Sequence, residues 1–171
     1  MPDVGAYIAE ERIVGRDGAG LYSVSGLEAI AACDTGRPAN RISATIYSPD
    51  YTNYSPMIML RYIDPANFLY LKGRTNGTLQ LQKRVAGVET GLTGTFTPNI
   101  QDGGTYRLLA TWNGAVFKVT QNEVFAINYA LSTGDATLFL GATKNAFALR
   151  NNSAGPTPGS DARISDIEVW S

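Results

Sequence analysis

The regular return of turn residues between short apolar segments is the feature that most constrains the fold of this chain. From residue 41 onward, turns containing Gly, Asn or Asp recur at intervals of roughly ten residues, a spacing typical of a sandwich or jelly roll. Residues 41–47 alternate, with Ile42 and Ile46 on one face, as in a half-buried strand. Asn113-Gly114 is the clearest hairpin signal, because the preferred turn needs positive φ at both positions. The pattern predicts an all-β, two-sheet antiparallel jelly-roll sandwich.

Further strands are expected at 57–63, 68–72, 79–85, 106–112, 115–121, 123–127, 137–142 and 163–170. Their inward side chains form the predicted core, which comprises Ile42, Ile46, Leu60, Leu69, Leu71, Leu79, Leu81, Leu108, Phe117, Val119, Leu138, Leu140, Ile167 and Val169. Residues 26–33 suit a short helix or a strand equally well, and residues 151–161 have the composition of a surface loop. We therefore expect no long helix.

Composition excludes several classes of function. The chain has 171 residues, enough for one domain with a sizeable core, and a net charge of −1, which gives no indication of nucleic-acid or anionic-membrane binding. No apolar stretch approaches the roughly 20 residues that span a bilayer, and the N-terminus shows no signal peptide. The absence of His excludes Ser-His-Asp and Cys-His catalysis and His-ligated zinc. Cys33 is the only cysteine, so no internal disulfide forms.

The order of strands and turns resembles a known family. Residues 59–71 (Met-Leu-Arg-Tyr-Ile-Asp-Pro-Ala-Asn-Phe-Leu-Tyr-Leu) precede residues 77–83 (Gly-Thr-Leu-Gln-Leu-Gln-Lys) and Gly87. Residues 106–110, the Asn113-Gly114 hairpin and a closing strand at 162–169 follow. This order is similar to that of the concanavalin A-like lectin/glucanase superfamily, in its laminin G-like branch. The resemblance covers residues 15–171 and leaves residues 1–14 as an edge strand or an attachment segment.

The resemblance implies two curved sheets packed face to face and a module that binds glycans, of the kind found in bacteriophage tail, fibre and head-spike proteins. Catalytic members of the superfamily carry a Glu-x-Asp-x-Glu strand. The nearest match here, Asp166-Ile-Glu168, has Ile164 where the first Glu would stand. Its alternative interpretation is an exposed polar face with a partner such as Arg163 or Arg61. We therefore expect no enzymatic activity.

Calcium is the metal that the resemblance raises. Six aspartates lie in predicted loops, namely Asp34, Asp50, Asp64, Asp102, Asp135 and Asp161, but they form no dense run of the kind that supplies six to eight oxygen ligands. Aspartate also stabilises turns through its own backbone, which explains such positions without a metal. We expect no cofactor and keep calcium as an alternative.

Candidate sugar-binding residues gather in one segment. Tyr47, Asp50, Tyr51, Asn53 and Tyr54 place three rings beside a carboxylate and an amide, the groups that stack on sugars and bind their hydroxyls. The alternative is that these rings fold back onto the sandwich. A second candidate surface contains Arg61 and Tyr70, which the alternation assigns to a polar sheet face. Trp112 suits the core or a strand end, and Trp170 suits an interface or a lid on the sheet edge.

The expected function is that of a non-catalytic carbohydrate-binding module. Its expected partners are a surface glycan such as a capsular polysaccharide and other virion structural proteins, with no nucleic acid and no membrane insertion. We expect an extracellular location on a virion or phage-like particle, where several copies or a homo-oligomer attach to a host. The alternatives are a decoration or spike subunit that binds no sugar, and a glycoside hydrolase.

Overall fold

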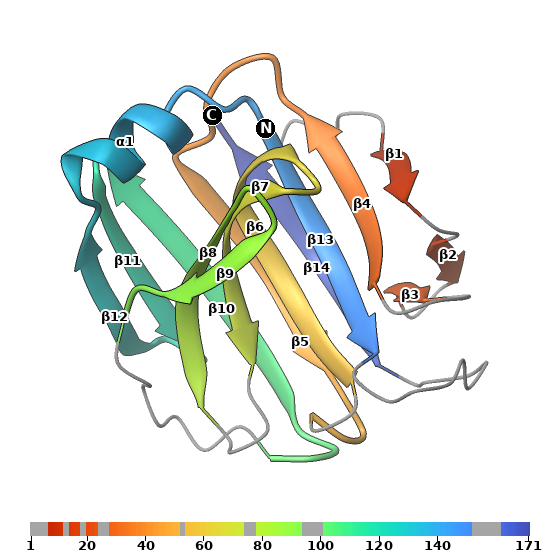
Figure 1. Ribbon diagram of the computed structural model, residues 1–171. Helices are drawn as coiled ribbons and strands as arrows, with labels where there is room; N and C mark the ends of the chain where they lie inside the picture. Colours follow the sequence, from red (N-terminus) through yellow and green to blue (C-terminus); the bar gives the residue numbers. More distant parts are fainter. Residues whose placement is uncertain are drawn as a thin grey trace.

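The computed structural model describes residues 7–11, 14–17, 20–23, 28–51, 54–73, 78–93, 101–151 and 162–171. Side chains are described for those of these residues that lie between 30 and 150 or between 162 and 171. Within these residues, strands form two seven-stranded antiparallel sheets that pack face to face (Figure 1). The expected all-β two-sheet sandwich is confirmed.

Each sheet combines strands from both halves of the chain. In order across sheet A lie β1 (Tyr7–Glu11), β4 (Glu28–Asp34), β13 (Lys144–Asn151), β6 (Tyr54–Asp64), β7 (Asn67–Gly73), β8 (Leu79–Val85) and β9 (Val88–Gly91). In order across sheet B lie β12 (Val124–Ala130), β11 (Val116–Gln121), β10 (Thr105–Asn113), β5 (Arg41–Tyr47), β14 (Arg163–Trp170), β3 (Gly20–Ser23) and β2 (Val14–Asp17). A hairpin turn joins β10 to β11 near the predicted position, but its two turn residues are Gly114 and Ala115. Asn113 ends β10 opposite Val116, and of the two residues predicted to have positive φ only Gly114 does, at 55°.

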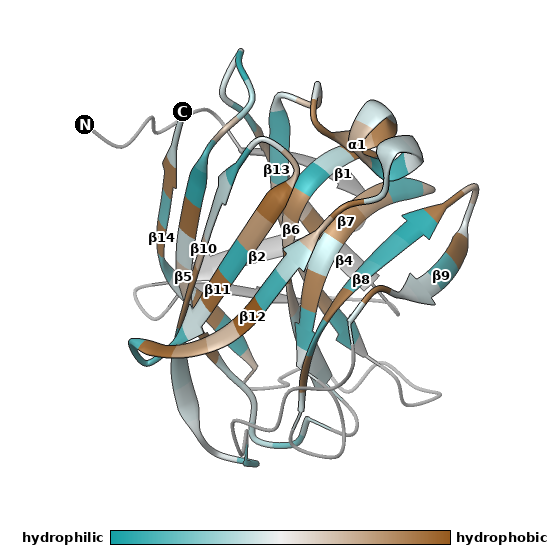
Figure 2. Ribbon diagram, turned by 90° about the vertical axis from the view of Figure 1, so that its left-hand side faces the viewer, coloured by the Kyte–Doolittle hydropathy of each residue, from teal (hydrophilic) through white to brown (hydrophobic). Residues whose placement is uncertain are grey.

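The main core lies between the two sheets, where the inward faces of their strands meet. Most predicted core residues are buried there, and Phe117 on sheet B is fully buried and stacks on Trp112 with ring centroids 5.3 Å apart. Figure 2 shows the matching alternation of hydrophobic and hydrophilic residues along the strands. Three core predictions are wrong: Leu138 is 40% exposed, and Leu140 and Ile167 are only half-buried.

A second apolar layer covers the opposite, outer face of sheet A. Side chains on β6 and β7 point alternately into the main core and into this layer, as the two-sided apolar pattern of residues 57–63 predicts. The layer contains Ile30, Ala32, Met57, Met59, Tyr62, Phe68, Tyr70, Ala146 and Ala148, all buried. Sheet A is therefore apolar on both sides, and polar groups on its outer face lie above this layer of buried apolar side chains.

The strand expected at residues 137–142 does not form: residues 137–139 end a helix, α1 (Thr133–Phe139), and residues 140–142 follow it without forming a strand. Ser132 caps it by accepting a hydrogen bond from the backbone N–H of Asp135, and Phe139 is its buried apolar contact. In this helix the side chain of Leu138 points toward solvent. The segment 26–33, for which helix and strand were both open, contributes to strand β4. No helix in the described residues is long and apolar enough to cross a membrane.

An ion pair holds α1 against sheet A. Lys83 of β8 lies 2.5 Å from Asp135, which also accepts a hydrogen bond from the Ser132 hydroxyl at 2.9 Å. Replacing Asp135 by Ala removes this pair and the acidic residue of the first helical turn. We expect the free energy of unfolding to fall by about 1 kcal/mol, measured by urea titration. Lys118→Ala, at an exposed strand position with negative φ, is the control, and an equal loss in both variants would contradict the assignment.

Candidate functional site

The edge of sheet A folds back across its own outer face. In the sheet order β9 is the last strand, four places beyond β13, yet Glu89 of β9 contacts Arg150 of β13 directly. The β8–β9 hairpin turns at Ala86 and Gly87, both of which have positive φ. Two hydrogen bonds tie this turn to the β6–β7 turn: Ala86 N–H donates to Asn67 Oδ1, and Gly87 N–H donates to the Ala66 carbonyl. β9 consequently lies across the front of the sheet in Figure 1.

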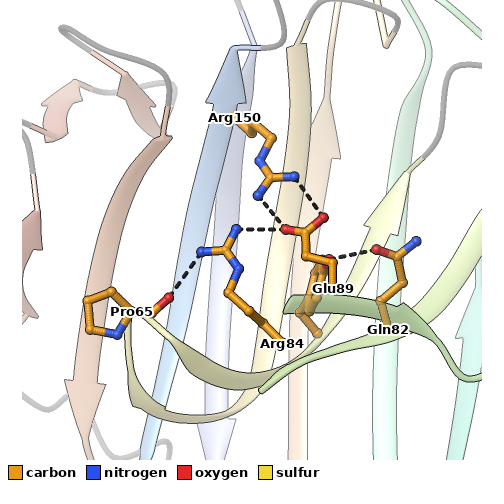
Figure 3. A network of polar contacts seen from close by, with 6 residues as sticks. Pro65, Gln82, Arg84, Glu89 and Arg150 are labelled. Carbon is orange, nitrogen blue, oxygen red and sulfur yellow. Dashed lines mark hydrogen bonds and ion pairs between the residues drawn. The ribbon is translucent and has the colours of Figure 1, made fainter. Parts of the chain in front are cut away.

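This return brings three charged side chains together in what we term the Glu89 cluster: Arg84, Glu89 and Arg150. Arg150 donates to both oxygens of Glu89, at 2.5 Å to Oε1 and 3.1 Å to Oε2. Arg84 donates to Glu89 Oε1 at 2.7 Å and to the Pro65 carbonyl at 3.0 Å (Figure 3). One carboxylate is thus fixed between two guanidinium groups that come from different strands.

Aromatic and amide side chains lie directly beneath the cluster. The guanidinium of Arg84 lies over the Phe68 ring, 4.5 Å from its centroid. The Tyr70 hydroxyl donates to Gln82 Oε1 at 2.6 Å, and Gln82 in turn donates to Gln80 Oε1 at 2.6 Å. The outward positions of Gln80, Gln82 and Arg84 on β8 follow the predicted alternation. A continuous chain of polar contacts therefore runs along the outer face of sheet A.

The cluster sets the protonation states of its own members. Burial alone would raise the pKa of Glu89, but hydrogen bonds from Arg150 and Arg84 lower it to about 2. Burial and the Glu89 carboxylate both raise the pKa of Tyr70. At neutral pH the site therefore presents an ionised carboxylate as an acceptor, two guanidinium groups as donors and a neutral phenol. The side chains of Glu89, Arg150 and Arg84 are 30%, 18% and 12% exposed, whereas Tyr70 is fully buried beneath them.

The predicted tyrosine segment lies elsewhere, at the junction of β5 and β6. Tyr51 is buried: its N–H donates to Asp102 Oδ1 at 2.8 Å and its ring packs edge-on against Tyr106. This ring has folded back onto the sandwich, the alternative considered above. Tyr47, Asp50 and Tyr54 are half-buried, and Asn53 lies outside the described residues. Their role in binding stays a prediction.

Arg61 and Tyr70 do not share a face, contrary to the sequence-based expectation. Tyr70 lies on the outer face of sheet A beneath the Glu89 cluster. Arg61 is 2% exposed and points into the sandwich, where its guanidinium carbon lies 4.4 Å from the ring centroid of Trp112 on sheet B. The reason is a bulge in β6 between Met59 and Arg61, which shifts the alternation by one residue. Trp112 is a core ring, as expected.

A smaller polar network lies on the outer face of sheet B. Arg107 donates to Glu168 Oε2 at 3.0 Å and to the Ser43 hydroxyl at 3.1 Å. The partner of Glu168 is thus Arg107, whereas Arg163 and Arg61 were the expected partners. Asp166 has a φ of 49°, and the pairing of β14 with β5 shifts between Ser165 and Glu168, so the Asp166-Ile-Glu168 segment is not a regular strand.

The loop aspartates form turn and cap contacts. Asp34 accepts from Gly36 N–H, Asp64 accepts from Ala66 N–H, and Asp102 accepts from Tyr51 N–H. In the described part of the chain, no group of three or more His, Cys, Asp or Glu residues is placed to hold a metal ion. These contacts explain the positions of the three aspartates without a cation.

Sequence reasoning missed Glu89 and Arg150 altogether. Neither β9 nor β13 was predicted, and the two residues lie 61 positions apart. The outward position of Arg84 was the one available signal, since a charged residue on the outer face of a sheet often has a partner of opposite charge nearby. The return of β9 over the sheet has no signature in local sequence.

Comparisons with known proteins agree with this architecture. No protein-family model matches the chain, and no curated protein matches its sequence. A carbohydrate-binding module, CBM66 from Bacillus subtilis, matches with a TM-score of 0.71 and 12% identity over 100% of this chain and 99% of that chain. The likeness supports the fold described above, an all-β two-sheet jelly-roll sandwich.

Two further neighbours have other descriptions. Apo Crh5 transglycosylase matches with a TM-score of 0.64 and 8% identity, over 99% of this chain and 80% of that chain. A tetrameric galectin from the ball sponge Cinachyrella sp. matches with a TM-score of 0.55 and 14% identity, over 83% of this chain and 99% of that chain. At such identities the likeness establishes the fold and leaves the choice of function to the site.

Proposed function

We propose that this chain is a non-catalytic carbohydrate-binding module and that the Glu89 cluster is its binding site. The observation that carries the proposal is the return of β9, which holds Glu89 between Arg84 and Arg150 on the outer face of sheet A. A carboxylate accepts hydrogen bonds from sugar hydroxyls, and guanidinium N–H groups donate to hydroxyl and ring oxygens. Because mutual contacts hold the three side chains in place, little side-chain entropy is lost when a sugar docks.

Two further observations support carbohydrate as the ligand class. The neighbours include a carbohydrate-binding module and a galectin, both of which have this sandwich fold. The Glu89 cluster is more enclosed than the Arg107–Glu168 pair on sheet B, whose side chains are 48% and 39% exposed, against 18% for Arg150 and 30% for Glu89. Enclosed charges form stronger hydrogen bonds because water competes less with the ligand.

The electrostatics of the cluster favour binding over catalysis. Retaining and inverting glycosidases both need a carboxylic acid that donates a proton to the leaving group, and a raised pKa equips that residue. Glu89 has the opposite property, because two guanidinium groups lower its pKa to about 2. Since one neighbour is a transglycosylase, the proposal needs a direct assay. We expect no release of reducing ends and no transfer products when the protein is incubated with any glycan that it binds.

The test is a glycan array probed with the wild-type protein and two matched variants. Arg150→Ala removes the bidentate partner of Glu89, and Arg107→Ala removes the corresponding arginine from sheet B. We expect Arg150→Ala to weaken binding to the recognised glycan by at least about tenfold, the value of roughly one charge-assisted hydrogen bond. Arg107→Ala should bind as the wild type does.

Three results would contradict the proposal. Loss of binding in Arg107→Ala alone would move the site to sheet B. Loss in neither variant, with loss when Tyr47 and Tyr54 are both replaced by Ala, would move it to the β5–β6 junction. Failure of the folded wild-type protein to bind any glycan would favour the alternative function, a structural or decoration subunit that binds no sugar. Circular dichroism of each variant confirms the fold.

We further propose that the protein acts in several copies outside the cell, on a virion or phage-like particle that attaches to a host polysaccharide such as a capsule. A site of three polar side chains gives an affinity of about millimolar to micromolar, and linked copies raise the avidity by about 10²–10⁴. A tetrameric galectin among the neighbours supports oligomerisation. The test is light scattering for the oligomeric state, with adsorption to encapsulated cells. A monomer that does not adsorb would contradict this part.

A further inference from the structure

Three side chains in the sandwich interior retain buried polar atoms that have no hydrogen-bond partner in the described part of the protein. The atoms are Nε of Arg61, Nε1 of Trp112, and both the oxygen and the nitrogen of the Asn145 side-chain amide. Their exposed fractions are 2%, 8% and 0%. Asn145 is the most unusual, because a buried strand position that pairs neither its donor nor its acceptor is normally occupied by an apolar residue.

The three residues come from β6, β10 and β13, and two of them contact the same connection: Arg61 donates to the Ala39 carbonyl and the backbone N–H of Trp112 donates to the Asn40 carbonyl. The guanidinium of Arg61 stacks on Trp112, 4.4 Å from the ring centroid, and so bridges the two sheets. On the strand beside β6, Lys144 pairs with Tyr62 and Ala146 pairs with Met59. Asn145 therefore lies opposite the bulge that contains Arg61. Alternation along β13 assigns Asn145 to the same inward face as the core residue Phe147.

The charge of Arg61 is uncompensated within the described residues. Its two terminal nitrogens donate to the carbonyls of Leu60 and Ala39, which satisfy hydrogen bonds but carry no negative charge. No carboxylate of the described part pairs with it. Burial lowers the pKa of Arg61 to about 10, so the group remains protonated at neutral pH. A buried cation without a counter-charge is strongly destabilising, and the Trp112 ring offsets this only in part.

We propose that Arg61, Trp112 and Asn145 bind a small monovalent anion of halide size. The unpartnered guanidinium N–H, indole N–H and amide NH₂ are donors, the groups that coordinate anions. An ordered water would accept hydrogen bonds from these donors but would leave the positive charge of Arg61 without a counter-charge. A monovalent anion would both accept the hydrogen bonds and neutralise that charge. A halide suits the site better than a phosphate because a close-packed interior admits few extra atoms. This site is independent of the Glu89 cluster, which lies on the other side of sheet A.

The test compares chloride with gluconate, an anion too large for a buried site, as sodium salts at the same ionic strength. If chloride binds with a dissociation constant of about 1 mM, the melting temperature in 100 mM chloride should exceed that in gluconate by at least about 5 °C. Arg61→Met preserves much of the side-chain volume and should abolish the difference. Arg107→Met, on the outer face of sheet B, is the matched control and should retain it.

A second variant and a second measurement keep the proposal testable if Arg61→Met does not fold. Trp112→Phe keeps a ring for Arg61 but removes the indole N–H, and should raise the chloride concentration at half-maximal stabilisation by about tenfold. Crystals soaked in bromide should show an anomalous peak between Arg61 and Asn145. Equal melting temperatures in chloride and gluconate, or no bromide peak, would overturn the proposal. A chloride effect that survives in Arg61→Met would assign it to the surface and would also overturn it.

Discussion

Replacing Phe117 by Ala is expected to lower the free energy of unfolding by about 4 kcal/mol, the typical cost of deleting a buried aromatic ring. Phe117 is fully buried in the main core and stacks on Trp112. Trp112 in turn lies against the guanidinium of Arg61, so the ring supports a contact between the two sheets as well as its own packing. The loss should appear as a lower midpoint in urea with an unchanged slope.

The neighbouring strand provides the control for this substitution. Phe125 on β12 is 55% exposed, so Phe125→Ala removes the same atoms from a largely solvated position. We expect that variant to remain within about 0.5 kcal/mol of the wild type. If both variants lost similar stability, the assignment of β11 and β12 side chains to the two faces of sheet B would be wrong, because a shift of one residue exchanges the faces.

Glu89→Gln is the second change with a large expected effect. It removes the negative charge that both Arg84 and Arg150 contact. The two ion pairs that hold β9 over sheet A are then lost. The Glu89 side chain is 30% exposed, so solvent screening reduces the stabilisation that corresponds to its pKa shift. After that discount we expect a loss of about 2 kcal/mol in the free energy of unfolding at pH 7.

The same substitution should change how stability depends on pH. The pKa of Glu89 is lowered from an ordinary 4.5 to about 2, so its contribution is complete above pH 4.5 and is lost as the pH falls toward 2. The difference between wild type and Glu89→Gln should therefore shrink to about half by pH 3. Urea titrations at pH 7, 4 and 3 measure it. If the difference in the free energy of unfolding stayed constant with pH, the contribution of Glu89 would not be ionic.

The sequence predicts the class of fold because many of the strands are signalled locally. The alternation of residues 41–47 appears where the pattern places it, and the hairpin predicted at Asn113-Gly114 forms one residue later, at Gly114 and Ala115. The error at residues 137–142 has a recognisable cause: a short apolar run is compatible with strand or helix, and Ser132 with Asp135 was the capping signal that favoured helix. Strand β13 was missed because Asn145 and Arg150 interrupt its apolar alternation.

The candidate site was less predictable because its geometry depends on long-range curvature. Glu89 and Arg150 meet only because the last strand of sheet A passes back over the others, and no short motif encodes that path. The position of Arg61 depended on a one-residue bulge in β6, which alternation cannot anticipate. The tyrosine segment was visible in the sequence, but whether Tyr51 faces solvent or core is decided by Asp102 in a distant turn and by Tyr106 near the start of β10.

The path of β9 also bears on how this protein avoids polymerising with itself. The last strand of an open sheet offers unpaired backbone N–H and C=O groups on which another chain can add, the first step of edge-to-edge aggregation. Here that strand has only four residues, includes a charged one, and is drawn away from the plane of the sheet by two arginines. If Glu89→Gln releases it, we expect that variant to aggregate at concentrations where the wild type stays dispersed.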